Sequence, residues 1–551
     1  MGQRQSAADW AEEMDQQLYC VEERRALPPA VTEGLLEALN GEASAEERQA
    51  VLARVGDYRE RSRRRAEWLL RILDRATAVD MKALEHAMAN SPAARYAGRA
   101  GFNRFHWILA VSGKGTDQNP ANVQKFAAAC GAWLATSQII SQLVERDEEL
   151  ARGVQVNPSQ ETQRRIWAVV VHFRWASELF CTSMAVEIQS NPTKYRGLEF
   201  VTQRAVTDLF KWVEAYVDRI DRQANDQAVG PVPSISSFAR PLIEALTVQG
   251  DEYRSKPFEG LTETLDIEAY PFVSVGGVIA PVALREATYG LELALLNLAR
   301  RLLCDEKDRS DLFENAVKRS LSRVLPSGID LPYAPVSIPI PKTKNKGETD
   351  FILRELSAHT FIGECKAMAA VQRSGTVIHS FSDDVGKAAK QLKLRMDAVK
   401  LGGEVRVDGL AWAAPTRNVY GIAVPLHAYG GAIWNHECLP HGDIDHPDIA
   451  VIPVHQLLVV ARAMEDAHDL GAYIRFRSAL FGLKLELRDE LDILAAYIFS
   501  DAMKIKALIE GAPEHGRRVI RAYGVELETA VSDVMPTSAR AWRNRLKRTL
   551  I

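Results

Sequence analysis

The sequence lacks the features that mark secreted, membrane-spanning and polycationic proteins. Its six cysteines lie far apart without a CxxC pair, and no signal peptide opens the chain, so we expect a reduced protein in the cytoplasm. Charged residues interrupt every apolar stretch before the roughly 18 residues that a membrane span requires. The formal net charge is only −4 over 551 residues. Any contact with nucleic acid must therefore come from a local basic surface.

Common catalytic motifs are absent as well. The sequence has no P-loop, no GxSxG motif and no Rossmann fingerprint after an expected strand. One segment, residues 427–455, is rich in zinc-ligand side chains: His427, His436, Cys438, His441, Asp443, Asp445, His446, Asp448 and His455. The spacing fits neither paired CxxC units nor HExxH on a helix, and the intervening glycines and prolines are typical of a surface loop. A zinc-dependent hydrolase built on this segment is therefore a minor alternative.

The length predicts two or three domains, because one hydrophobic core does not extend over 551 residues. Residues 1–300 have the pattern of a mostly helical region. Within residues 65–79 the apolar positions recur as expected for an amphipathic helix: Trp68, Leu69, Ile72, Leu73 and Ala76. Residues 166–184 are apolar enough for a buried helix. Helix breaks are expected at Asn191-Pro192 and at 230–233.

The pattern changes from helical to mixed after residue 270. The segment 270–282 is β-branched and interrupted by glycine, which predicts a hairpin or a short connection, and helices are expected over 284–303 and 310–324. Short β-prone runs then follow, at 336–340, 350–356, 360–365, 409–414 and 422–426. A helix over 380–400 separates the third run from the fourth, an order typical of an α/β layer. From about residue 456 the pattern is helical again.

Two acidic residues and one lysine fall at the ends of neighbouring β-prone runs. Asp350 opens one run, and Glu364 and Lys366 end the next. Alternate side chains of a strand share a face, so Glu364 and Lys366 point the same way. Phosphodiester hydrolysis requires neutralisation of the phosphate and an activated water, and a divalent metal held by carboxylates contributes to both. Magnesium prefers one or two protein carboxylates. These three residues are therefore the candidate catalytic core.

The stretch TDFILRELSAHTFIGECK resembles the PD-(D/E)xK, or restriction-endonuclease-like, nuclease superfamily. The resemblance implies that Asp350 and Glu364, with the backbone carbonyl of Cys365, hold Mg²⁺, for which Mn²⁺ can substitute. It also implies that Lys366 orients or deprotonates the attacking water. Thr349 replaces the proline of the family name, at a position that varies widely in the superfamily.

Polar residues on the two flanking helices are further candidates. In relatives of the superfamily the helix before the strands often carries an extra acidic metal ligand, and Glu314 is the matching residue; the alternative is an exposed ion pair with Lys318. On the following helix, Lys387, Gln391 and Arg395 recur every four residues. Relatives have a polar residue there, often Gln or Lys, that reaches the active site or the phosphate. Gln391 is therefore a candidate catalytic residue and Lys387 a candidate nucleic-acid contact, with a solvated helix face as the alternative.

Three clusters of basic residues could contact a nucleic-acid backbone. The segment before Asp350 carries Lys342, Lys344 and Lys346. An N-terminal run and a C-terminal stretch form the other two: Arg59, Arg61, Arg63, Arg64 and Arg65, and Arg540, Arg543, Arg545, Lys547 and Arg548. A merely soluble loop is an equal alternative for the first cluster, and a solvated helix face is favoured for the other two.

These observations predict a multidomain chain of α and α/β class. A helical region over 1–300 selects substrate or partner, a restriction-endonuclease-like mixed β-sheet flanked by helices covers 305–465, and a helical region covers 466–551. The expected function is Mg²⁺-dependent hydrolysis of nucleic-acid phosphodiester bonds, with DNA favoured over RNA, and an activating or regulatory protein partner fits this organisation. Prokaryotic restriction or anti-phage defence is a setting suggested by analogy of fold alone. The main alternative is a catalytically inactive nuclease fold that binds nucleic acid or protein.

Overall fold

The chain divides into two units, and neither is continuous in sequence. In the computed structural model one unit comprises Met1–Pro158 and Arg204–Leu298, and the other comprises Ser159–Gln203 and Ala299–Ile551. The structure describes residues 45–75, 125, 129, 133, 173–224, 228, 230–248, 269–275, 278–281, 290–303, 305–340, 347–355, 359–367, 385–426, 448–481, 487, 490–499, 505, 507, 510–512, 516, 519–520, 538–541 and 543–544. In this part of the chain, no helix combines the length and the apolar character needed to cross a bilayer.

The first unit is largely helical where it is described. Its elements are α3 (Ala45–Arg75), α10 (Gln203–Ala224, whose first residue belongs to the other unit), α11 (Arg240–Ala245), β1 (Thr247–Val248), β2 (Phe272–Val275) and β3 (Val278–Ala280). Strands β2 and β3 are antiparallel, which confirms the hairpin expected over 270–282. On α10, Trp212 packs edge-on against Phe272 with the ring centroids 5.3 Å apart, and this contact ties the helix to the small sheet.

One residue of the expected apolar face on α3 lies elsewhere. Leu69 is buried, as expected, but Trp68 is 59% exposed. Ala66 and Leu69 define the buried face of the helix, and Trp68 lies about a quarter turn away from it. Placing Trp68 on the apolar face was therefore wrong.

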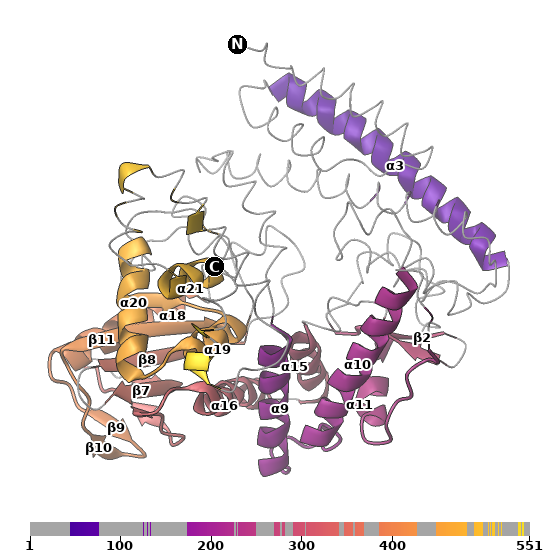
Figure 1. Ribbon diagram of the computed structural model, residues 1–551. Coiled ribbons are helices and arrows are strands. Elements are labelled where there is room, and N and C mark those ends of the chain that lie inside the picture. The colour runs from indigo at the N-terminus through magenta and orange to yellow at the C-terminus, as the bar shows by residue number, and fades with distance from the viewer. Residues whose placement is uncertain are drawn as a thin grey trace. The chain divides into compact units, whose positions relative to one another are not determined.

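The second unit is built on a five-stranded mixed sheet with the strand order β12-β11-β8-β7-β4 (Figure 1). Its strands are β4 (Ile329–Asp330), β7 (Phe351–Glu355), β8 (His359–Lys366), β11 (Asn418–Pro425) and β12 (Ile449–Val451). The central strand β8 pairs antiparallel with β7 and parallel with β11. It is buried along its whole length except at its last residue, Lys366, which is the pattern of a strand covered on both faces.

A second, smaller sheet delivers the chain to the start of β7. It has the order β10-β9-β5-β6 and contains β5 (Val336–Ser337), β6 (Glu348–Thr349), β9 (Val405–Val407) and β10 (Leu410–Trp412). The run 409–414 was expected beside the other strands, but β10 is the edge of this small sheet, and Leu410 is 74% exposed. Asp350 is the single residue between β6 and β7, so it lies where the chain passes from one sheet to the other.

Helices cover both faces of the large sheet. They are α9 (Arg174–Ser190), α15 (Leu291–Leu302, which contains the boundary between the units), α16 (Glu306–Val324), α18 (Gly386–Lys400), α19 (Val454–Ala463), α20 (Ala467–Phe481) and α21 (Glu490–Phe499). Helix α18 follows β8 in the chain and packs on β8 and β11. Gly421 of β11 lies directly under Met396 and Leu392 of α18. On the opposite face, Gly471 of α20 lies against the ring of His359.

Helix α16 begins and ends where local chemistry predicts. The Asp305 side chain accepts a hydrogen bond of 2.8 Å from the backbone N–H of Lys307, and acidic residues occupy the first turn. Its apolar side packs on α9, where Phe313 and Phe180 meet edge to face with centroids 5.7 Å apart. Helix α9 therefore belongs with the sheet, whereas the sequence suggested one boundary near residue 300.

Candidate active site

The pairing of β7 with β8 places the two acidic residues side by side. Phe351 lies opposite Gly363, and Ile352 lies opposite Ile362. One further step along this antiparallel register sets Asp350 opposite Glu364, and directly opposed residues of a sheet share a face. Asp350 accepts a hydrogen bond of 2.6 Å through Oδ2 from the backbone N–H of Cys365. That bond holds the Asp350 carboxylate at the end of β8.

Lys366 completes this group from the same strand. It is two residues beyond Glu364, so both side chains extend from one face. The Lys366 Nζ lies 3.6 Å from Oε2 of Glu364. Glu364 is buried, whereas a quarter of the Lys366 side chain remains exposed. The structure thus brings together the three residues that the sequence singled out, with the ammonium at the open end of the site.

Glu314 reaches the same cluster from α16. It accepts a hydrogen bond of 3.0 Å from the Ser310 hydroxyl. Burial and the nearby negative charge of Asp350 raise the pKa of Glu314 to about 7. Lys318 is buried, and its positive charge lowers the pKa of both Glu314 and Asp350. The alternative of an exposed Glu314–Lys318 pair is therefore wrong, because both residues belong to the buried cluster.

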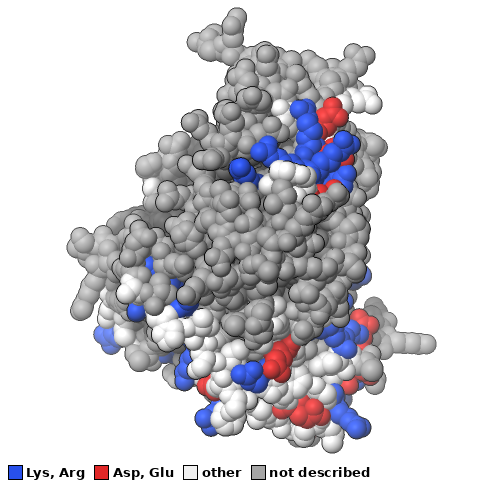
Figure 2. Space-filling model, turned by 90° about the vertical axis from the view of Figure 1, so that its right-hand side faces the viewer, with Lys and Arg blue, Asp and Glu red and all other residues white. Residues whose placement is uncertain are grey.

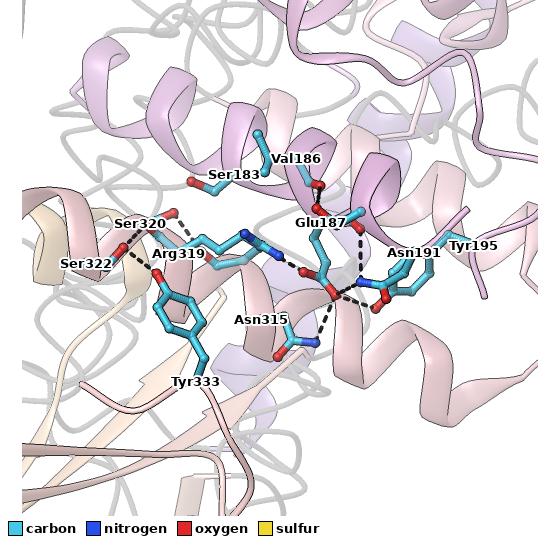
Figure 3. A network of polar contacts seen from close by, with 12 residues as sticks. Ser183, Val186, Glu187, Asn191, Tyr195, Asn315, Arg319, Ser320, Ser322 and Tyr333 are labelled. Atoms are coloured by element: carbon cyan, nitrogen blue, oxygen red, sulfur yellow. Dashed lines mark hydrogen bonds and ion pairs between the residues drawn. The ribbon is translucent and has the colours of Figure 1, made fainter. Parts of the chain in front are cut away.

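A second polar network holds α16 against α9, as Figure 3 shows. The buried Glu187 carboxylate accepts hydrogen bonds from Arg319 Nε (2.8 Å), Asn315 Nδ2 (3.1 Å) and Asn191 Nδ2 (2.9 Å). Two of these donors lie on α16, one turn beyond Glu314. Lys194, just after α9, adds a contact of 2.5 Å to Asp311 of α16. This network fixes the helix that carries Glu314 into the site.

Helix α18 contributes Arg395, which is 4% exposed. Its guanidinium donates to Oε1 of Glu364 through Nη1 and to the backbone carbonyl of Glu348 through Nη2. Thr349 donates at 2.9 Å to the carbonyl of Gly363 and lies 3.4 Å from Oε1 of Glu364. These bonds connect the helix to β6 and β8 at the site.

The helix residue that bonds to Glu364 is Arg395, whereas the sequence assigned the catalytic role to Gln391. Gln391 is half-buried one turn before Arg395, and its Oε1 has no hydrogen-bond partner among the described residues. Lys387, a further turn back, is exposed. The signal for Arg395 was the same four-residue spacing that drew attention to Gln391.

The carboxyl groups of the cluster are electrostatically strained. Burial and then the charge of Asp350 raise the pKa of Glu364 to about 7, although Arg395 and Lys366 act in the opposite direction. Burial raises the pKa of Asp350 as well, against the hydrogen bond from Cys365. The Cys365 thiol, fully buried beside these acids, has a pKa well above its usual value. Added positive charge would therefore favour the ionised carboxylates.

The donor types of the site match a hard divalent cation. Asp350 and Glu364 supply carboxylate oxygens, and the backbone carbonyl of Cys365 faces the same strand edge as its N–H group, which bonds to Asp350. One or two carboxylates are enough for Mg²⁺, which keeps several waters. No group of three or more His, Cys, Asp or Glu side chains with the arrangement of a metal site occurs in the described residues. Arg395, already bonded to Glu364, is the one feature of this donor set that a cation must contend with.

Most other candidate residues lie outside the described part of the chain. Lys342, Lys344 and Lys346 do so, as do residues 427–447 of the histidine-rich segment; His455 is buried within α19. Among the C-terminal arginines, Arg543 donates at 2.7 Å to the carbonyl of Ala463 and forms an ion pair of 2.7 Å with Asp469. Arg543 is therefore bonded within the fold.

The N-terminal basic run on α3 is partly neutralised within its own helix. Arg63 forms ion pairs with Glu60 and Glu67, and Arg64 with Glu60, at distances of 2.6 to 2.8 Å. Near the top of Figure 2, acidic side chains lie beside basic ones. These pairs agree with a solvated helix face. Comparison of the chain with protein-family models, with curated proteins and with solved structures finds no match.

Proposed function

We propose that this protein is a metal-dependent nuclease that hydrolyses phosphodiester bonds, with DNA as the favoured substrate. The observation that carries the proposal is the convergence of Asp350, Glu364 and Lys366 at the end of β8. Two carboxylates beside an ammonium, at the end of a strand, supply ligands for a hard cation and a donor for a water or a phosphate oxygen. Buried acidic groups are unfavourable without compensation, so their concentration here favours a functional role.

The order of the elements supports a restriction-endonuclease-like fold. Helix α16 precedes the antiparallel pair β7 and β8, and α18 then leads to β11, which is parallel to β8. This is the order expected from the resemblance, with the acidic residues at the start of β7 and the end of β8. The helices on both sides of the sheet exclude solvent from all but the Lys366 end of β8.

Each residue of the site has a separate task in the proposed reaction. Asp350, Glu364 and the Cys365 carbonyl would hold the cation, which neutralises phosphate charge and lowers the pKa of a bound water. Lys366 donates a hydrogen bond at the exposed end of the site, where it orients the attacking water or the phosphate. The water oxygen forms a bond to phosphorus, the bond to the leaving oxygen breaks, and the leaving oxygen takes up a proton.

The proposal is tested by incubating the full chain with plasmid, linear and single-stranded DNA and with RNA, in the presence of Mg²⁺ or Mn²⁺. We expect cleavage by the wild type and loss of cleavage in Lys366→Ala. Lys393→Ala on the exposed face of α18 is the matched control, because it removes a lysine outside the cluster. Equal cleavage by wild type and Lys366→Ala would overturn the assignment, and a wild type inert on all four substrates would count against it.

One observation favours the alternative of a non-catalytic binding module. Arg395 already satisfies part of the charge of Glu364, as it would in a fold that has no need of a cation. The two functions differ in whether a divalent cation binds at Asp350. Calorimetric titration of the wild type and Asp350→Asn separates them, since only the nuclease requires a cation site that the substitution removes.

A further inference from the structure

The contacts of Arg395 on Glu364 bear on how a cation can enter the site, and the inference below rests on the proposed function. Arg395 is a buried side chain whose two terminal nitrogens are both engaged, one by Glu364 Oε1 and one by the carbonyl of Glu348. Its Nε is also buried and has no hydrogen-bond partner among the described residues. The guanidinium therefore bridges β8 and β6 at the point where a cation would bind.

Both oxygens of Glu364 face protein donors. Oε1 receives the guanidinium of Arg395 and lies 3.4 Å from the Thr349 hydroxyl, and Oε2 lies 3.6 Å from Lys366. Hydrogen bonds between two ionised partners are among the strongest in proteins, and burial strengthens them further. A cation that takes Glu364 as a ligand must weaken the contact with Arg395.

We infer that Arg395 is an internal counter-ion that competes with the divalent cation for Glu364. In the empty site it keeps a buried carboxylate paired, and removal of one partner from such a pair is strongly destabilising. Its charge also repels an incoming cation. The protein then needs a higher concentration of free cation than the two carboxylates alone would demand, so Arg395 sets a threshold for loading the site.

The experiment measures binding of Ca²⁺ and Mn²⁺ to the full chain by isothermal titration calorimetry, without nucleic acid. Arg395→Gln removes the charge and keeps a polar side chain, and we expect its affinity for the cation to be about tenfold higher or more than that of the wild type. Arg395→Lys keeps the charge but cannot bridge two acceptors, so its affinity should fall between the two. Lys393→Gln, an exposed charge change on the same helix, should alter the affinity by less than about twofold.

Thermal melts and circular dichroism establish that each variant is folded, and Arg395→Lys provides the comparison if Arg395→Gln is not. Affinity in both Arg395 variants equal to or weaker than wild type would overturn the inference, because Arg395 would then be holding Glu364 in place for the cation. Absence of cation binding in every variant would overturn it too, together with the proposed metal site. If the variants bind the cation more tightly but no nucleic acid is cleaved, the competition stands and the nuclease assignment fails.

Discussion

Asp350 raises the pKa of Glu364 from the adjacent strand position. The two carboxyl groups oppose each other's ionisation because the register of β7 and β8 sets them opposite one another and burial removes the water that would screen them. Their proximity is what makes the site suited to a cation, and it also makes the empty site sensitive to pH.

Stability of the cation-free protein should fall as pH rises toward 8. Glu314 and Glu364 have pKa values of about 7 in the fold, against an ordinary value of 4.5. Between these values the folded chain binds more protons than the unfolded chain, so the contribution of these groups is present below pH 4.5 and is lost as pH rises through 7. Melting temperatures measured with a chelator from pH 5 to pH 8 check this.

The double variant Glu314→Gln/Glu364→Gln is the control for that pH dependence. It removes both groups that take up the proton, so its melting temperature should decline less over the same range. Identical pH profiles for the double variant and the wild type would show that these carboxyl groups do not carry the effect. Ca²⁺ should raise the wild-type melting temperature more at pH 8 than at pH 5.5, because protons compete for the same oxygens.

Asp350→Asn should abolish cleavage without unfolding the chain. Asparagine still offers an oxygen to the Cys365 N–H, but it loses the charge that a cation requires. We expect the rate of cleavage to fall by about 100-fold or more, and cation binding to be lost in calorimetry. Asp397→Asn, an exposed acid on α18, is the matched control. Wild-type rates in Asp350→Asn would exclude this residue from catalysis.

Gly363→Ala should destabilise the protein. A β-carbon at Gly363 would lie 2.1 Å from ring carbons of Phe351, which is fully buried on the paired strand. Overpacking of this kind costs about 1–3 kcal/mol, measured as a lower free energy of unfolding in urea. Gly386→Ala is the control, because no heavy atom lies within 4 Å of that position. Recovery of stability in Gly363→Ala/Phe351→Leu would identify the ring as the cause; a neutral Gly363→Ala would refute the clash.

Glu187→Ala should destabilise the unit that contains the sheet, because it leaves Arg319, Asn315 and Asn191 without their shared acceptor. Breaking a buried ion pair from one side costs about 3–5 kcal/mol. Glu244→Ala removes an exposed ion pair with Arg240 and should change stability by less than about 1 kcal/mol. Chemical denaturation measures both. Equal effects in the two variants would show that the Glu187 network adds no more than a surface pair.

The sequence was informative where side-chain direction follows from local periodicity. Strand alternation placed Glu364 and Lys366 on one face, and the structure has them 3.6 Å apart. Helix and strand positions near the site were also close, because the caps and breakers are local signals: Asp305 begins α16, and the chain turns after Ser190 before Pro192.

Long-range packing was beyond the reach of spacing. Gln391 and Arg395 lie about 40° apart around α18, and only the position of β8 decides that Arg395 meets Glu364. The contact of Phe180 with Phe313 joins residues far apart in sequence, so nothing local marked α9 as part of the sheet unit. Proximity to Asp350 likewise decided between the two readings of Glu314.

The discontinuity of the sheet unit has a practical consequence for dissecting the protein. A truncated chain that starts at residue 300 would lack α9, and Phe313 and Arg319 would lose the partners against which they pack. Such a fragment is expected to aggregate or melt early, and its inactivity would say nothing about catalysis. An excised catalytic module should instead join Ser159–Gln203 to Ala299–Ile551 through a short flexible tether.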